Sequence, residues 1–233
     1  MRLVVTHRGS QMRLRRVLCA SLIIAPPLAI VSISHAQTPL PRRLGLTGGI
    51  NSASFGGTDP NAPPPERHRG FVGGALLVVP INRRVGFEPE LLYTMKGAES
   101  TNQAGTGAFK LNYVELPLLV RYEVEPSSGF RPFFVAGPGI ALKTSCTIEA
   151  TTFGSSQSSS CADLAAQTGS NVAFRSLDYG LIFGGGFAFD VYGKTLTGGG
   201  RYNYGLARIA DSSPTKNRVF SLLTTIEFPL SRR

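Results

Sequence analysis

Few residues in this chain could do chemistry, and they fall into three small groups. The first is a single histidine: after residue 36 only His68 remains, beside the charged residues Glu66, Arg67 and Arg69 in a proline-rich stretch. Hydrolytic sites commonly pair a nucleophile with a histidine, so an enzyme hypothesis would rest on His68 alone. We expect a solvated charge cluster in a loop, and therefore no enzyme, no metal site and no cofactor.

The second group is a pair of cysteines, Cys146 and Cys161, which flank a Ser/Thr-rich segment of 14 residues. Export would place them in a compartment where disulfides form. We expect a disulfide that staples the loop 144–174, with two free thiols as the alternative. Loops on a rigid scaffold are usual places for binding, so this loop is either a binding element or a mobile protective one.

The third group is a set of sparse charges on otherwise apolar segments. It comprises the expected members of an ionic network: Glu88, Glu90, Glu115, Arg121, Asp178, Arg201 and Glu227. Counted in residues from the nearest short turn, Glu115 and Asp178 lie farther along their strands than the other five members of the network. Lys96 lies at a similar height to these two. We expect Arg121 and Arg201 each to bind carboxylates, because the planar guanidinium satisfies two oxygens at once. The alternative is that these charges line a water-filled pore.

Extended segments must position these charges, because apolar and polar residues alternate with a period of two. In the segment 218–228, for example, one face carries Phe220, Leu222, Thr224, Ile226 and Phe228, and the other carries Ser221, Leu223, Thr225 and Glu227. Turn-forming residues separate eight such segments. We expect strands near residues 44–54, 70–81, 85–97, 109–124, 130–143, 175–191, 195–207 and 218–230. Both faces of 70–81 and 130–143 are apolar or glycine, so the register of these two stays open.

The gaps between the expected strands alternate in length. Short connections fall at 82–84, 125–129 and 192–194, and long ones at 55–69, 98–108, 144–174 and 208–217. This alternation is typical of a meander with one rim outside and the other facing the periplasm. We therefore expect an all-β fold, an eight-stranded antiparallel up-and-down transmembrane β-barrel.

Alternation shows that each strand has an apolar face, but it does not show whether that face points out of the barrel or into it. The alternative to a membrane barrel is a soluble periplasmic lipocalin-like barrel, in which the apolar face would point inward. The mixed face is too sparsely charged for a good water-exposed surface. The apolar faces end in aromatics such as Tyr93, Tyr122, Tyr202, Tyr204 and Phe228, which suit membrane interfaces. We therefore expect lipid outside. Eight strands enclose room only for their own side chains, which favours a plugged lumen over the alternative of a narrow passive pore.

The first 36 residues are typical of a cleavable signal peptide. A basic stretch precedes an apolar run at 17–33, and Ser34-His35-Ala36 predicts cleavage before Gln37. The true start is Met1 or Met12. We expect residues 1–36 to be the signal peptide and residues 37–233 to be the barrel domain. No run of ~20 apolar residues follows, so a membrane location would require a closed barrel.

The composition argues against nucleic-acid binding. Of 24 Lys and Arg residues, five lie in the first 36 positions, where there is no acid. The remaining 19 basic and 14 acidic residues are scattered, with no basic run interleaved with aromatics. We therefore expect no nucleic-acid partner.

Several segments resemble strands of PorT-like proteins, a group also described as porin family or outer membrane protein beta-barrel domain proteins. FEPELLYTMKG at 87–97 is similar to "QPELLYSQKG" of that family, and LNYVELPLLVRY at 111–122 is similar to "YLEIPLLLRY". RPFFVAGPG at 131–139 resembles "PYVFAGPG". The segments 178–186 and 201–206 resemble its sixth and seventh strands. The resemblance covers about residues 44–230, in order.

The resemblance implies an eight-stranded barrel in the outer membrane of a Gram-negative-type bacterium. Outer-membrane lipid and the barrel-insertion machinery are then its expected partners. It implies little about activity, although one member of the group assists protein secretion. We expect a monomer with a structural, binding or secretion-accessory role through its outer loops, whose extracellular or secretion partner the sequence does not name.

Overall fold

The computed structural model describes residues 40–56, 66–102, 105–124, 130–152, 155–168, 175–209 and 214–230. They belong to one compact unit. The expected signal peptide, residues 1–36, and the two possible starts, Met1 and Met12, lie outside the described residues.

The described part of the chain contains nine strands and one helix. Their bounds are β1 (Arg42–Gly56), β2 (Glu66–Pro80), β3 (Val85–Asn102), β4 (Gly105–Glu123), β5 (Phe130–Thr152), β6 (Ser155–Ser160), α1 (Cys161–Thr168), β7 (Leu177–Val191), β8 (Lys194–Gly205) and β9 (Lys216–Leu230). In the same ranges, no helix is long and apolar enough to cross a membrane.

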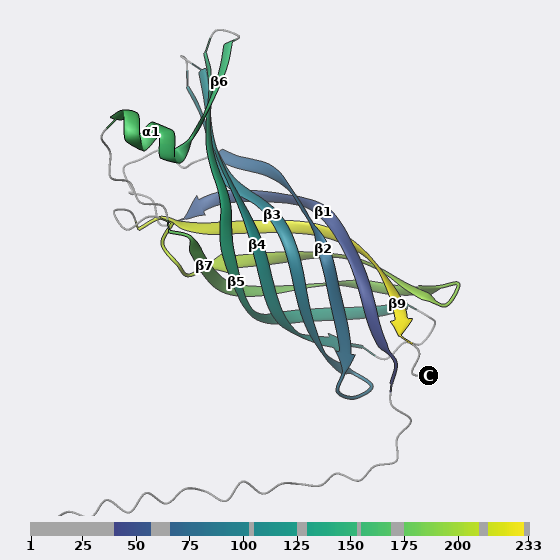
Figure 1. Ribbon diagram of the computed structural model, residues 1–233. Coiled ribbons are helices and arrows are strands. Elements are labelled where there is room, and N and C mark those ends of the chain that lie inside the picture. The colour runs from purple at the N-terminus through teal and green to yellow at the C-terminus, as the bar shows by residue number, and fades with distance from the viewer. Residues whose placement is uncertain are drawn as a thin grey trace, which may run out of the picture. The chain divides into compact units, whose positions relative to one another are not determined.

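Eight strands close into an antiparallel ring in the order β1, β2, β3, β4, β5, β7, β8, β9, with β9 pairing back on β1 (Figure 1). Only β6 stands outside the ring, where it pairs with the outer part of β5. Ring closure pairs the strand edges, which is the condition for a sheet to span lipid. The expected all-β, eight-stranded antiparallel barrel is confirmed.

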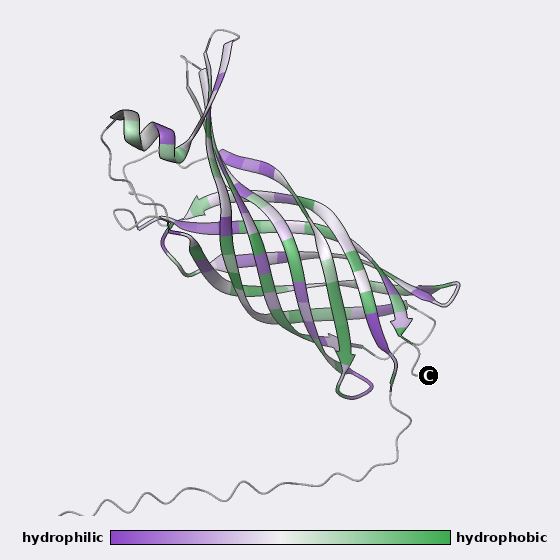
Figure 2. Cartoon of the chain, viewed as in Figure 1, coloured by the Kyte–Doolittle hydropathy of each residue, from purple (hydrophilic) through white to green (hydrophobic). Residues whose placement is uncertain are grey.

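The apolar faces of the strands point outward, and the polar faces point into the lumen. Ile50 is 65% exposed and Leu222 is 50% exposed, whereas Arg121 is 2% exposed and Glu227 is fully buried. Figure 2 shows the alternation as green and purple positions along the barrel strands. This arrangement is the inverse of a soluble barrel, so the lipocalin-like alternative is wrong.

The structure settles the two registers that the sequence left open. In β2, Val72 faces the lumen and Phe71 faces outward; in β5, Phe133 faces the lumen and Phe134 faces outward. Phe133 is part of a buried apolar cluster on β4, β5 and β7, which consists of Leu119, Phe133, Val135, Ile182 and Ala188. The lumen is therefore partly apolar, which explains why both faces of these strands carry apolar residues.

Two of the expected loops are largely strand. The predicted loop at 98–108 is occupied by β3, which runs to Asn102, and β4, which begins at Gly105. The predicted loop at 144–174 contains the end of β5, all of β6 and α1. Backbone ladders from β3 through β6 hold these segments, although their Ser, Thr and Gly residues lack an alternating pattern.

We call the part of β3, β4 and β5 beyond the ring, together with β6 and α1, the projection. It extends from one end of the barrel, and the end of β9 lies at the opposite end (Figure 1). In Figure 2 the β5–β6 hairpin is mostly pale or purple, in contrast to the green barrel wall. The projection is therefore a polar structure on an apolar-walled barrel.

Candidate functional site

The lumen is the first candidate site, and its layer nearest the short turns is centred on Arg121 of β4. Arg121 Nη1 donates to Glu88 Oε2 of β3 at 2.8 Å and to Glu227 Oε1 of β9 at 2.8 Å. Arg43 of β1 donates from Nε to Glu227 Oε2 at 2.6 Å and also pairs with Glu123. Four strands thus contribute charges that neutralise one another in a buried layer.

The middle layer pairs Arg201 of β8 with Glu90 of β3. Arg201 Nη1 donates to Glu90 Oε2 at 2.6 Å. Glycine is required opposite, because a Cβ on Gly184 would lie 2.5 Å from Arg201 Cβ. A cavity of about 40 Å³ lies between this layer and Arg121.

The upper layer is centred on Lys96 of β3, which is 1% exposed. Lys96 Nζ donates to Glu115 Oε1 at 3.0 Å and to Asp178 Oδ2 at 3.3 Å. Asn203 Nδ2 donates to Glu115 at 2.6 Å, and Asn217 Nδ2 donates to Asp178 at 2.7 Å. The buried ammonium is thus held by two carboxylates that have further donors of their own.

An apolar cap closes the lumen above Lys96. Its buried members are Leu111, Tyr113, Ala141 and Ile209, with Phe55, Phe109 and Cys146 packed against them. Ile209 comes from the β8–β9 connection, where Ile209 N donates to Thr215 O at 2.9 Å and Arg175 N donates to Ile209 O at 2.9 Å. These backbone bonds hold Ile209 between the residues that precede β7 and β9.

The structure places all seven predicted network residues in the lumen, each at most 8% exposed. They form three groups at different heights: Arg121 with two glutamates, Arg201 with Glu90, and Lys96 with Glu115 and Asp178. Sequence reasoning missed further lumen residues: Arg43, Asn203, Asn217 and Ile209. The asparagines carry no charge, and Ile209 lies outside the strand ladders, so neither gave a usable signal.

The prediction that His68 belongs to a solvated loop is wrong. His68 lies in β2 and is 5% exposed, and its Nδ1 is 2.6 Å from Glu99 Oε1 of β3. The strand starts earlier than expected because Glu66 and Arg67 pair with β3 across a register shift. Among the described residues, no group of three or more His, Cys, Asp or Glu could hold a metal ion.

The expected disulfide is present and joins Cys146 of β5 to Cys161, the first residue of α1. Ser160 caps the helix: Asp163 N donates to Ser160 Oγ at 3.1 Å, and Ser160 Oγ donates to Asp163 Oδ2 at 2.7 Å. The disulfide and the cap together tie α1 to the sheet of the projection. The projection is therefore the second candidate site, built as an ordered unit.

Comparison with known proteins identifies the family. Residues 35–211 match the family described as outer membrane protein beta-barrel domain. No curated protein matches the chain. Similar solved structures include Neisserial surface protein A (17% identity, TM-score 0.48, 81% of this chain and 97% of that one). OprG of Pseudomonas aeruginosa is similar at 11% identity (TM-score 0.48, 82% and 98% covered).

Ail, the attachment invasion locus protein of Yersinia pestis, is similar at 13% identity, with a TM-score of 0.40 and 81% and 100% of the two chains covered. The family match covers most of the chain and includes seven of the eight ring strands described above. The polar lumen and apolar outer wall agree with a barrel surrounded by lipid. The chain belongs to the outer membrane protein beta-barrel domain family and is an outer-membrane protein.

Proposed function

We propose that the protein is a sealed, non-conducting anchor in the outer membrane that displays the projection outside the cell. The closed lumen is the observation that supports this most strongly. Three charged layers and an apolar cap fill the bore, and the cavity beside Arg121 measures only about 40 Å³. Ions would have to pass every layer, so the narrow-pore alternative is disfavoured.

The orientation follows from the connections. Outer-membrane barrels keep short turns on the periplasmic side and long connections outside. The short turns at 81–84 and 192–193 lie at the end of the barrel away from β6 and α1. The projection therefore faces outward, where an ordered polar surface on a rigid scaffold suits contacts with other molecules.

The same geometry supports a structural or binding role over catalysis. His68 faces the barrel interior beside Glu99 and is almost fully buried, so it is poorly placed to serve a substrate. A secretion-accessory role is the second candidate, because several strand motifs resemble those of PorT-like proteins, one of which assists protein secretion. In both cases the barrel acts as a monomeric support for the projection.

Conductance in planar bilayers tests the seal. We expect no steady single-channel steps from the wild-type protein. We expect openings from R121S/R201S/K96S/I209S, which removes the central cation of each layer and Ile209 of the cap, and whose folding is verified by heat-modifiable gel migration. The variant shows that a permeable barrel is detectable in the same assay. Steady steps from the wild type would overturn the sealed-anchor proposal.

Labelling of intact cells tests the display. We expect an epitope inserted at Ser155, the outer end of β6, to bind antibody on whole cells. A matched epitope inserted at Arg83, in the short β2–β3 turn, should bind antibody only after the outer membrane is permeabilised. The reverse pattern would place the projection in the periplasm.

A further inference from the structure

The lipid-facing wall carries a groove of about 560 Å³ across β1, β9, β8 and β7. Its floor is glycine backbone, and its sides are large apolar residues. The lining residues that project outward are Ile50, Gly185, Phe187, Gly198, Gly200, Leu222 and Thr224. A Cβ built on Gly198 would meet nothing within 4 Å. The groove is therefore open on the side that faces lipid.

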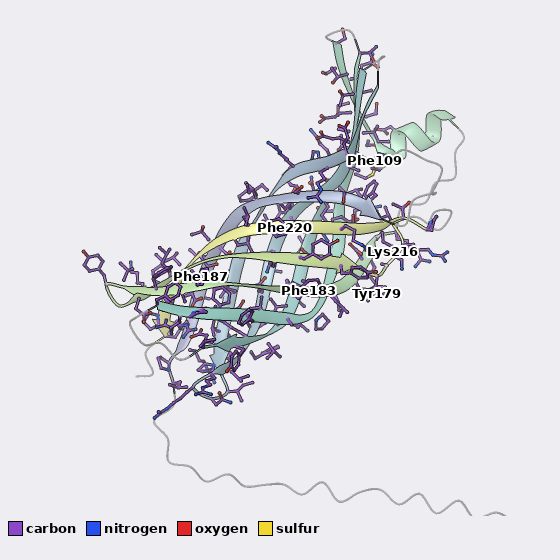
Figure 3. The ribbon with its side chains drawn as sticks, turned by 180° about the vertical axis from the view of Figure 1, so that it is seen from behind. Phe109, Tyr179, Phe183, Phe187, Lys216 and Phe220 are labelled. Carbon is purple, nitrogen blue, oxygen red and sulfur yellow. A yellow bond between two sulfur atoms is a disulfide. The ribbon has the colours of Figure 1, made fainter. Side chains whose placement is uncertain are left out.

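The strand register places this groove at the middle of the apolar band. Gly198 pairs with Thr224 of β9, and the outward apolar residues of β9 run from Phe220 to Phe228, with Thr224 at their centre. One step above the groove lies an aromatic row formed by Phe183, Tyr202 and Phe220. Figure 3 shows Phe183 and Phe187 along β7 and Phe220 nearby on β9. The groove thus lies near the bilayer midplane.

Basic residues lie at the outer end of the same face. Lys216 and Arg218 continue the outward-facing row of β9 above Phe220, and Arg208 follows β8 and is exposed. The Arg218 guanidinium stacks on the Tyr204 ring at 3.7 Å. We call these three cations the outer basic cluster. Among the described residues no carboxylate pairs with Lys216, and Asp211 lies outside them.

The distance between groove and cluster matches half a bilayer. Arg218 and Lys216 lie six and eight residues from Thr224 along β9. At about 3.3 Å per residue and a tilt near 40°, they lie roughly 15 and 20 Å above the groove along the membrane normal. Half of the hydrocarbon core is about 15 Å. One lipid could therefore place its headgroup at the cluster and a chain end in the groove.

We propose that this face is a binding site for a phosphorylated lipid of the outer leaflet. The outer basic cluster binds the phosphate, and an acyl chain passes the aromatic row and ends in the glycine groove. Lys216 supplies charge where the headgroup lies, and the missing side chains of Gly198 and Gly200 supply room where the chain ends. The site is distinct from the sealed lumen, and its assignment to the outer leaflet rests on the orientation proposed above.

A single tryptophan reports lipid occupancy, because the chain contains none. Phe220→Trp is reconstituted in phosphatidylcholine vesicles with increasing fractions of chain-brominated phosphatidic acid or chain-brominated phosphatidylcholine. We expect brominated phosphatidic acid to reach half-maximal quenching at a mole fraction at least about fivefold lower than brominated phosphatidylcholine does. A fivefold preference corresponds to the contribution of one lysine near anionic headgroups, about 1 kcal/mol. Equal quenching by the two lipids would overturn the proposal.

Two variants separate headgroup from chain. We expect Lys216→Gln to lower the preference for phosphatidic acid several-fold, and Gly198→Leu to weaken quenching by both lipids. The controls are Lys194→Gln, at the opposite rim, and Ala75→Leu, which creates the same side chain on the lipid-facing side of β2 and adds one carbon fewer. Heat-modifiable gel migration verifies that each variant is folded. Equal effects of the variants and their controls would contradict the site. Cross-linking of the reconstituted protein checks the other occupant of the groove: if Gly198→Leu lowers dimer cross-linking and leaves lipid quenching unchanged, the groove binds a second copy and the proposal is overturned.

Discussion

Removing Arg121, the centre of the charged layer nearest the short turns, should destabilise the barrel strongly. Arg121 Nη1 bonds both Glu88 and Glu227, at 2.8 Å each. In Arg121→Leu, Glu227 keeps Arg43 at 2.6 Å. Glu88, which is 4% exposed, loses the cation that it pairs with among the described residues. Breaking a buried pair in this way costs about 3–5 kcal/mol, because it leaves an uncompensated charge.

Reversible urea unfolding in lipid vesicles, followed by heat-modifiable migration, measures this loss. The double variant Arg121→Leu/Glu88→Gln removes the stranded charge, so we expect it to recover much of the stability. Glu88→Gln alone should cost less than Arg121→Leu, because Arg121 retains Glu227 and its proximity to Glu123 at 2.9 Å. Unchanged stability in Arg121→Leu, or no recovery in the double variant, would refute the account of the lumen.

Three further changes test other parts of the structure. Arg201→Leu should lower the unfolding free energy in the same assay, because it leaves Glu90 without the guanidinium at 2.6 Å, and Glu90→Gln added to it should restore part of the loss. Cys146→Ser/Cys161→Ser should leave the barrel transition unchanged but expose the projection to protease, because the disulfide ties α1 to β5; full protease resistance would contradict this. Leu222→Arg should cost roughly 2–4 kcal/mol of unfolding free energy in vesicles, because it places a cation near the lipid midplane; a neutral effect would contradict the assigned sidedness.

The barrel was predictable because its strands alternate with a period of two and its turns alternate in length. In β9, Phe220 and Leu222 point outward and Ser221 and Glu227 inward, as the pattern predicts. Counting from the short turns also placed Arg121 and the glutamates it binds at similar heights. These relations depend on local chain geometry, which the sequence carries directly.

The projection and the apolar cap were not predictable in the same way. Residues 98–102 and 105–109 form strands because they pair with each other and because 106–109 also pair with β5, although their composition is typical of a loop. Ile209 lies outside the strands and packs against the cap through its backbone bonds to Arg175 and Thr215, and no periodic pattern marks that residue. The lumen also contains Phe133 and Val135 of β5; both faces of that strand carry apolar residues, so the sequence did not assign them to a face.

Methyl NMR with a lipid that carries a spin label at the chain end tests most directly whether the apolar faces contact lipid. The protein is reconstituted in nanodiscs with and without the labelled lipid. We predict strong broadening of the Ile50 and Leu222 methyl signals, which face outward, and little change for Leu92 and Leu119, which are at most 1% exposed and face the lumen. Broadening of the Leu92 and Leu119 signals, with Ile50 and Leu222 unaffected, would contradict the structure's sidedness and the membrane assignment built on it.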